Sequence, residues 1–202
     1  MVTTGSITSA MLPRRVPGRM GHVNQRAMQL FFSLLALIAL AGAVVIVVSR
    51  LFGRRNAALG ELRNSVSTVA LPLAALVAVT SMLGSLYFSE VADLLPCTLC
   101  WYQRIAMYAT AIILVVATIR RRDWTVRPYA LTLAVIGAIV STYHYLVEWF
   151  PEIESDGVCS LTVPCNYVWF RRLGFVTIPF MALCGFLAVG ALLAFCRPEE
   201  ER

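Results

Sequence analysis

The chain has 202 residues, of which 59% are hydrophobic and 14% are charged. A soluble domain of this length is usually about a quarter charged, so the composition excludes an ordinary soluble enzyme. The net charge of +6 comes from 17 basic residues, all of them arginine, which lie in short clusters between apolar runs. That placement is typical of the flanks of membrane helices and argues against a nucleic-acid-binding protein.

Residues 1–26 are rich in Thr, Ser, Gly, Pro and Arg, which predicts a disordered N-terminal tail. The uncharged stretch 27–49 follows, and it is long enough to cross a bilayer, which takes about 20 apolar residues. Its apolar run exceeds the usual length in a signal peptide, and no clean cleavage site follows it. We therefore expect this stretch to be a retained transmembrane helix.

Four further stretches are long enough to cross the bilayer, and short connections join them: 64–89, 101–119, 128–147 and 173–196. Pro72 and Pro179 stand near the start of two of these stretches, where proline is tolerated because first-turn N–H groups lack partners. The sequence thus predicts an all-α integral membrane protein. We expect a four-helix transmembrane bundle at 64–196, one extra transmembrane helix at 27–49 and a C-terminal tail at 197–202.

Arginine in short loops marks the cytoplasmic side of a membrane protein. The connections 50–63 and 120–127 and the C-terminal end hold ten arginines, the opposite side holds six, and Arg104 lies within a span. This count places the loops 89–100 and 148–172 outside the cytoplasm. The basic tail would then also lie outside, against the rule, so the orientation of the first helix stays open.

The six cysteines form three pairs along the chain: Cys97 and Cys100, Cys159 and Cys165, and Cys184 and Cys196. The first two pairs lie in or beside the two loops expected outside the cytoplasm, where thiols tend to become disulfides. The third pair lies in the last span, with its members too far apart on one helix to bridge each other. We interpret these two cysteines as small apolar packing residues.

Purely structural disulfides are one alternative for the loop cysteines, and a zinc site built from all four is another. The five residues between Cys159 and Cys165 exceed the usual zinc spacing, and an outer loop favours oxidation, so no metal is predicted. Two neighbouring pairs on one side of a membrane favour a third interpretation. In it, electrons pass from pair to pair by thiol–disulfide exchange.

The CxxC pair stands where the apolar stretch 101–119 begins. The N–H groups and the dipole at a helix start favour negative charge, so a thiolate is stabilised there. Arg104 follows Cys100 by four residues and lies on the same helix face. A snorkelling arginine is the alternative interpretation, but a charge beside a dithiol favours a functional role.

The sequence holds no haem, flavin or nucleotide motif that would accept electrons from this dithiol. A quinone needs no soluble binding domain, because it can lie between helices near the membrane surface. Arg104 could then stabilise the reduced quinone electrostatically, within reach of Cys100.

Several segments together resemble the disulfide bond formation protein B (DsbB) family, especially its short-loop, BdbC-like branch. These are PCTLCWYQR at 96–104, YHY at 143–145, VPC at 163–165 and GFVTIPFMAL at 174–183. The resemblance covers roughly residues 66–196. It implies a four-helix bundle in the bacterial plasma membrane, a quinone cofactor (menaquinone or ubiquinone) and an extracytoplasmic thioredoxin-fold, DsbA-like thiol oxidase as partner.

Carried over residue by residue, the resemblance implies a route for electrons. Cys159 and Cys165 take them from the partner and pass them to Cys97 and Cys100, which pass them to the quinone pool beside Arg104. The chain would thereby support disulfide formation in exported proteins. The extra N-terminal helix and the tight 159–165 spacing depart from the family pattern, so which of these two cysteines the partner attacks stays open.

His144 lies about one turn before the end of the fourth predicted span. An ionisable residue inside a membrane is a candidate for function, here quinone contact or proton handling. The alternative is a histidine that is hydrogen-bonded within the bundle or at the membrane surface.

Two other functions fit parts of the pattern. A quinone reductase of the vitamin K epoxide reductase type also couples loop cysteines to a CxxC, but there the CxxC lies late in a helix. A non-catalytic membrane scaffold with structural disulfides is the second alternative.

Overall fold

The computed structural model describes residues 19–53, 57–120, 123–154, 159 and 163–196. Six α-helices form its body: α1 (Arg19–Phe52), α2 (Ala57–Ser67), α3 (Ala70–Leu86), α4 (Thr98–Ile119), α5 (Arg127–Trp149) and α6 (Ile178–Phe195). Short helical turns continue α3 as η1 (Tyr87–Val91), precede α5 as η2 (Trp124–Val126) and follow α5 as η3 (Pro151–Ile153).

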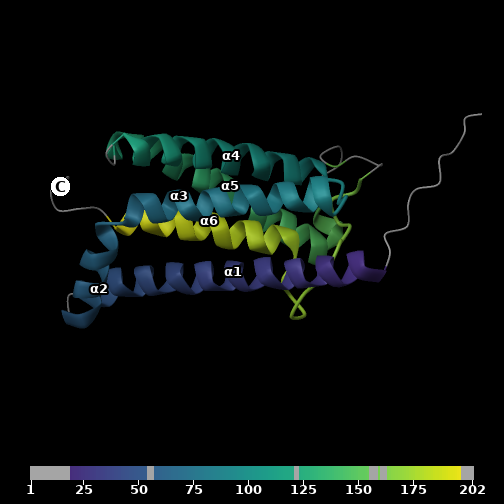
Figure 1. Cartoon of the computed structure of the whole chain (residues 1–202), viewed down its shortest axis with the longest axis horizontal. Coiled ribbons are helices and arrows are strands. Elements are labelled where there is room, and N and C mark those ends of the chain that lie inside the picture. The colour runs from purple at the N-terminus through teal and green to yellow at the C-terminus, as the bar shows by residue number, and fades with distance from the viewer. Residues whose placement is uncertain (1–18, 54–56, 121–122, 155–158, 160–162, 197–202) are drawn as a thin grey trace, which may run out of the picture.

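Five of the described helical stretches are long and apolar enough to cross a membrane: Asn24–Phe52, Ala70–Val91, Thr98–Ile119, Trp124–Trp149 and Ile178–Phe195. The five spans lie side by side along one axis, and α2 joins α1 to α3 at one end (Figure 1). The prediction of an all-α integral membrane protein with one helix beyond a four-helix bundle is therefore confirmed.

α6 is the central helix of the bundle, because it packs on α1, α3 and α5, while α4 packs on α3 and α5. Small side chains allow this close approach, as is usual between helices in membranes. Ala70, Ala74 and Ala78 on α3 are fully buried. Gly137 on α5 lies directly against the ring of Phe186 on α6, which is also buried.

Arg127 ties the start of α5 to the end of α6. Its Nε donates to the carbonyl of Leu193 at 2.6 Å, and its Nη2 donates to the carbonyl of Ala194 at 3.2 Å. The last carbonyls of a helix have no partner within the helix, so the guanidinium satisfies groups that would otherwise be left unpaired.

Three boundaries differ from the sequence prediction. α1 begins at Arg19, so the helix includes the last part of the segment expected to be a tail; residues 1–18 lie outside the described residues. The span expected at 64–89 is broken between α2 and α3, and helical structure continues through η1 to Val91. The break falls where Thr68 Oγ1 donates to the carbonyl of Ser65, since such side chains compete with the helix for backbone groups.

The last span begins at Ile178 and not at residue 173. Leu173 and Gly174 have positive φ angles of 53° and 83°, a conformation incompatible with a right-handed helix. Arg172 and Val176 pair across this tight turn through an isolated antiparallel bridge. The predicted C-terminal tail at 197–202 lies outside the described residues.

Both loops that hold cysteines lie at one end of the bundle, together with the N-terminal end of α1 (Figure 1). α2, the connection between α4 and α5 and the end of α6 lie at the opposite end. We refer to the first of these as the cysteine end.

Close packing at Gly137 yields a test of the α5–α6 contact. A Cβ at this position would overlap the Phe186 ring, whereas a Cβ at Gly190 on α6 meets nothing within 4 Å. We expect Gly137→Leu to lower the free energy of unfolding in detergent by about 1–3 kcal/mol, because overpacking forces the helices apart. Gly190→Leu is the matched control, and an equal loss in both variants would contradict the packing described here.

Candidate functional site

Cys97 is the N-terminal cap of α4. Its Sγ accepts a hydrogen bond from the backbone N–H of Cys100 at 3.3 Å, which satisfies one of the unpaired donors of the first turn. The two sulfur atoms lie 3.0 Å apart as thiols. Cys97 is buried and Cys100 is half-buried. The dithiol thus stands at the start of a transmembrane helix, as its position in the sequence predicts.

The Cys97 thiol lies just before the membrane-spanning part of α4, and its pKa is held well below the usual value. The hydrogen bond from the Cys100 side chain is the largest cause, burial opposes it, and His144 lowers the pKa further. The lowered pKa favours the thiolate form of Cys97.

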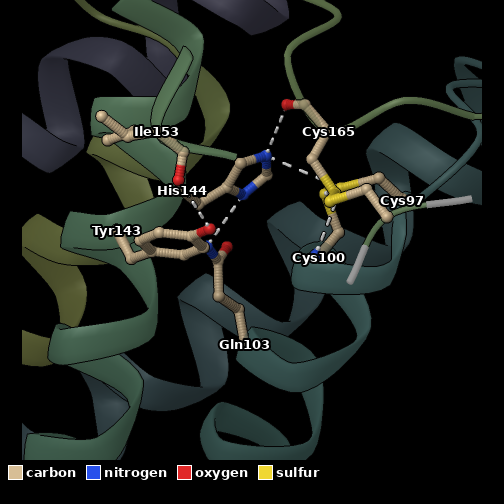
Figure 2. Close-up of a disulfide and its surroundings, with 8 residues drawn as sticks. Cys97, Cys100, Gln103, Tyr143, His144, Ile153 and Cys165 are labelled. Carbon is tan, nitrogen blue, oxygen red and sulfur yellow. Dashed lines mark hydrogen bonds between the residues drawn. A yellow bond between two sulfur atoms is a disulfide. The ribbon is translucent and has the colours of Figure 1, made fainter. Parts of the chain in front are cut away.

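His144 on α5 joins the two cysteine pairs (Figure 2). Its Nδ1 lies 3.0 Å from Nε2 of Gln103, and its Nε2 lies 3.1 Å from the carbonyl oxygen of Cys165 and 3.6 Å from Sγ of Cys97. With the Gln103 amide donating to Nδ1, the neutral ring carries its proton on Nε2. That proton faces both the Cys165 carbonyl and the Cys97 sulfur.

Cys159 and Cys165 form a disulfide, with their Cα atoms 5.7 Å apart. Cys165 belongs to the same buried cluster as Cys97, Leu99 and Val147, and Cys159 packs against the edge of that cluster. Cys165 is only 1% exposed, whereas Cys159 is half-buried. The two pairs are thus neighbours, and Cys159 is the more accessible member of the outer pair.

Arg104 and His144 line different pockets, and Cys100 lines both of them. The Nη2 of Arg104 donates to the carbonyl of Ser85 on α3 at 3.1 Å, and its guanidinium carbon lies 5.4 Å from the centre of the Trp101 ring. Cys100, Gln103 and Arg104 together line a cavity of about 480 Å³ between α1, α3, α4 and α6. This volume falls in the range of small-molecule sites, and most of the lining is apolar.

The structure divides the predicted site residues between two faces of the CxxC. Cys97, His144 and the Cys159–Cys165 disulfide lie on one face, which we call the thiol face. Arg104 lies on the other, beside the cavity. His144 is not among the residues lining that cavity; its contacts are with Gln103, which does line it, and with the Cys165 carbonyl and the Cys97 sulfur.

Sequence reasoning missed two residues of the thiol face, Gln103 and Glu148. Gln103 lies within the CxxC segment itself and hydrogen-bonds His144. Glu148 follows His144 by four residues, and this spacing on one helix face was a signal that could have been read. Its Oε2 is buried without a hydrogen-bond partner. It lines a pocket of about 10 Å³, about the least space that can hold one water molecule, together with Cys97, Cys100 and His144.

A zinc site built from all four loop cysteines does not fit this arrangement, because Cys159 and Cys165 are bonded to each other. Cys97, Cys100 and His144 offer ligand atoms within 4.8 Å of one another, which is enough for three coordination positions. Cys184 and Cys196 are buried in α6 and directly after it, outside the site, in agreement with the expected packing role.

Comparison with known proteins adds independent information. A family model described as disulfide bond formation protein DsbB matches residues 67–196. Disulfide bond formation protein C of Bacillus subtilis (strain 168) is 42% identical over 125 residues, which cover 62% of this chain and 90% of that protein. The probable disulfide formation protein of Oceanobacillus iheyensis is 43% identical over 123 residues, covering 60% of this chain and 84% of that protein.

Probable disulfide formation protein C 1 of Bacillus anthracis is 44% identical over 107 residues, which cover 53% of this chain and 76% of that protein. No solved structure matches the chain. The family match begins at residue 67, so it includes α3 to α6 and leaves α1 outside.

The low pKa of Cys97 predicts a pH titration in the reduced protein. In a Cys159→Ser, Cys165→Ser background, we expect the ultraviolet absorbance of a thiolate to persist from about pH 8 to about pH 6, well below the usual cysteine pKa of about 8.5. A lowered pKa keeps the thiolate as the pH falls, and the signal is lost only below the folded-state pKa. Cys100→Ala removes the largest cause, so the midpoint should rise; an unchanged midpoint would contradict this origin of the shift.

Proposed function

The chain belongs to the DsbB family of disulfide bond formation proteins, and we propose that this membrane disulfide-forming oxidoreductase passes electrons from an extracytoplasmic thioredoxin-fold oxidase to quinone. The observation that carries the proposal is the placement of the CxxC. It lies between a disulfide in an outer loop on one face and an apolar cavity with an arginine on the other.

The reaction begins at the outer pair. A thiolate of the partner attacks Cys159, which is the more exposed sulfur, and Cys165 leaves as a thiolate beside Cys97. The second thiol of the partner then attacks the mixed disulfide at the partner sulfur. The partner departs with a disulfide, and two electrons and two protons have passed to Cys159 and Cys165.

The inner pair receives these electrons in the same way. With Cys97 and Cys100 joined as a disulfide, the Cys165 thiolate attacks Cys97, and Cys159 then attacks Cys165. The Cys159–Cys165 disulfide forms again, and Cys97 and Cys100 become thiols.

His144 and Glu148 are the groups on the thiol face that can take up or supply the proton of a cysteine thiol. The Nε2 proton of His144 faces the Cys97 sulfur and stabilises negative charge there. Glu148 lies one turn after His144 on α5 and lines the same small pocket. A water molecule in that pocket would link its carboxylate to the thiols. The Cys97 sulfur lies 3.0 Å from the Cys100 sulfur. Cys97 is therefore placed to form the bond to Cys100 when two electrons pass from the dithiol to the acceptor, and this bond restores the CxxC disulfide.

The cavity beside Cys100 fits a quinone. Its polar side chains near the dithiol are Cys100, Gln103 and Arg104, and the rest of the lining is largely apolar. When bound, a quinone accepts the two electrons and two protons and becomes the quinol. Arg104 is held in place by Ser85 and Trp101, so its charge is oriented before negative charge develops in the cavity.

We further propose that the cysteine end faces the outside of the bacterial plasma membrane. The arginine-rich connections 50–63 and 120–127 belong to the opposite end of the bundle, which supports a cytoplasmic position for that end. This orientation presents the Cys159–Cys165 loop to exported proteins.

Turnover by the purified protein tests the proposal. Given a reduced thioredoxin-fold dithiol protein and quinone, the wild type should reduce quinone and oxidise the partner in equal amounts. Cys100→Ser should still form a mixed disulfide with the partner, yet lose quinone reduction by about two orders of magnitude or more, because the electrons have no exit. Cys184→Ser is the control and should retain activity.

Failure of the wild type with both benzoquinones and naphthoquinones would refute a quinone-dependent activity. If both cysteine pairs stay oxidised after exposure to the reduced partner, a scaffold with structural disulfides is favoured instead.

The role of Arg104 has a separate test. Arg104→Met removes a charged donor from the cavity, and such a bond is worth about 1.5–3 kcal/mol, so kcat/KM for quinone should fall about tenfold to a hundredfold. Arg104→Lys keeps the charge and should recover part of the loss. Steady-state kinetics at saturating partner measure both variants, and wild-type kcat/KM in Arg104→Met would remove Arg104 from the mechanism.

A further inference from the structure

α1 contributes to the cavity although it lies outside the part of the chain that matches the family. Eight of its residues line the cavity: Phe32, Leu35, Ala36, Ile38, Ala39, Gly42, Ala43 and Ile46. The remaining lining comes mainly from α3, α4 and α6, which belong to the matched segment 67–196. Without α1, the cavity would be an open groove along the bundle.

Several contacts hold α1 in position over this groove. Ala43 packs against Ala188 and Ala191 of α6 in a small buried cluster. At the cysteine end, the centre of the Phe32 ring lies 5.5 Å from the centre of the Phe88 ring of η1. The edge of the Phe32 ring also packs on Gly84, so closely that a Cβ on that glycine would lie only 2.8 Å from it. α1 is therefore a fixed wall of the cavity.

Arg172 adds a polar contact at the same end, because its guanidinium donates to Oε1 of Gln29 through both Nε and Nη2. This pair joins α1 to the tight turn that precedes α6. The bond anchors the first turns of the span directly beside the redox loops.

The cavity is elongated, and its long direction runs along the helix axes. On α1 its lining runs from Phe32 to Ile46, fifteen residues that rise by about 21 Å, and on α3 and η1 it runs from Leu73 to Phe88, about 22 Å. The hydrocarbon core of a bilayer is about 30 Å thick. The cavity therefore extends from the dithiol through much of the membrane.

Polarity is distributed unevenly along this length. Cys100, Gln103 and Arg104 lie at the cysteine end. Ser85 and Tyr108 come next along α3 and α4, and Thr80 and Ser81 lie about one turn further along α3. The far part, with Ile46, Leu73 and Leu192, is apolar. Ile38 and Leu76 line the cavity and are also 67% and 61% exposed, so the space opens towards the lipid between α1 and α3. The shape suits a molecule with one polar ring and a long hydrocarbon tail.

We propose that α1 is a binding element for the prenyl tail of a membrane quinone, forming the outer wall of a tail channel that the four-helix part leaves open. This inference rests on the proposed function, because it assumes that the ring of the same molecule lies beside Cys100. Apart from Phe32 at the cysteine end, the lining residues of α1 then contact the tail and not the reacting ring.

Gly42 offers a direct test. It lines the cavity, and a Cβ there meets nothing within 4 Å, so a leucine side chain would occupy the channel and not clash with protein. Gly190 on α6 has the same open surroundings and does not line the cavity, which makes Gly190→Leu the matched control. Ile38→Ala removes a tail contact without filling space and serves as a second variant.

The measurement is binding to wild type and variants in lipid nanodiscs, with quinone concentration expressed per lipid. Tryptophan fluorescence quenching is followed with a long-tailed quinone and with the same ring lacking a prenyl tail. We expect Gly42→Leu to weaken binding of the tailed quinone about tenfold and Ile38→Ala about threefold, with the tail-free ring unchanged, because only tail burial is lost. Gly190→Leu should bind both quinones as tightly as the wild type. Between these two leucine variants, only Gly42→Leu should copurify with less long-tailed quinone than the wild type does.

The outcomes separate this inference from the proposed function. If the wild type binds neither quinone, the proposed function fails and the tail channel with it. If the wild type binds both quinones, two results refute the tail channel while the proposed function stands. In the first, Gly42→Leu and Ile38→Ala bind the tailed quinone as tightly as the wild type does. In the second, these variants bind the tailed and the tail-free quinone more weakly by the same factor. Loss of copurifying phospholipid with unchanged quinone binding would assign the space to an acyl chain and refute it as well.

Discussion

Cys97 accepts a hydrogen bond from the backbone N–H of Cys100 at the first turn of α4, and the geometry of the dithiol depends on this cap. The contact fixes both sulfur atoms at the level where an outer loop meets the membrane. The hydrogen bond between the side chains makes the two thiols unequal, because negative charge on Cys97 is stabilised by its partner and by His144. One sulfur is thereby assigned to hold charge and the other to face the cavity.

The two faces of the CxxC are built by different helices. α5 supplies His144 and Glu148 to the thiol face, and the loop before α6 brings the Cys165 carbonyl onto the same histidine. α3 supplies Ser85, which orients Arg104 beside the cavity. Because α4 packs on both α3 and α5, its first turn borders the Cys159–Cys165 disulfide and the cavity at the same time.

α1 changes the shape of the cavity beside Cys100 and Arg104. The family-matched helices provide the dithiol and the arginine, but they leave the far part of the cavity open to lipid. By packing on α6 along Ala43 and contacting Gly84 with Phe32, α1 covers one side of a surface groove that stays open between α1 and α3. The extra span thus shapes the cavity and makes none of the described contacts with the cysteine sulfur atoms.

The sequence by itself determined the membrane helices, the position of the CxxC at a helix start and the spacing of Arg104 from Cys100, because apolar length and helical periodicity are local properties. It did not determine the break before Ala70 or the turn before Ile178, where side-chain hydrogen bonds and positive φ angles overrule a continuous apolar run. Only the tertiary structure placed His144 against Cys97, paired it with Gln103 and brought α1 over the cavity. These relations join residues far apart in the chain, and they depend on which face each helix turns to its neighbour, which packing alone decides.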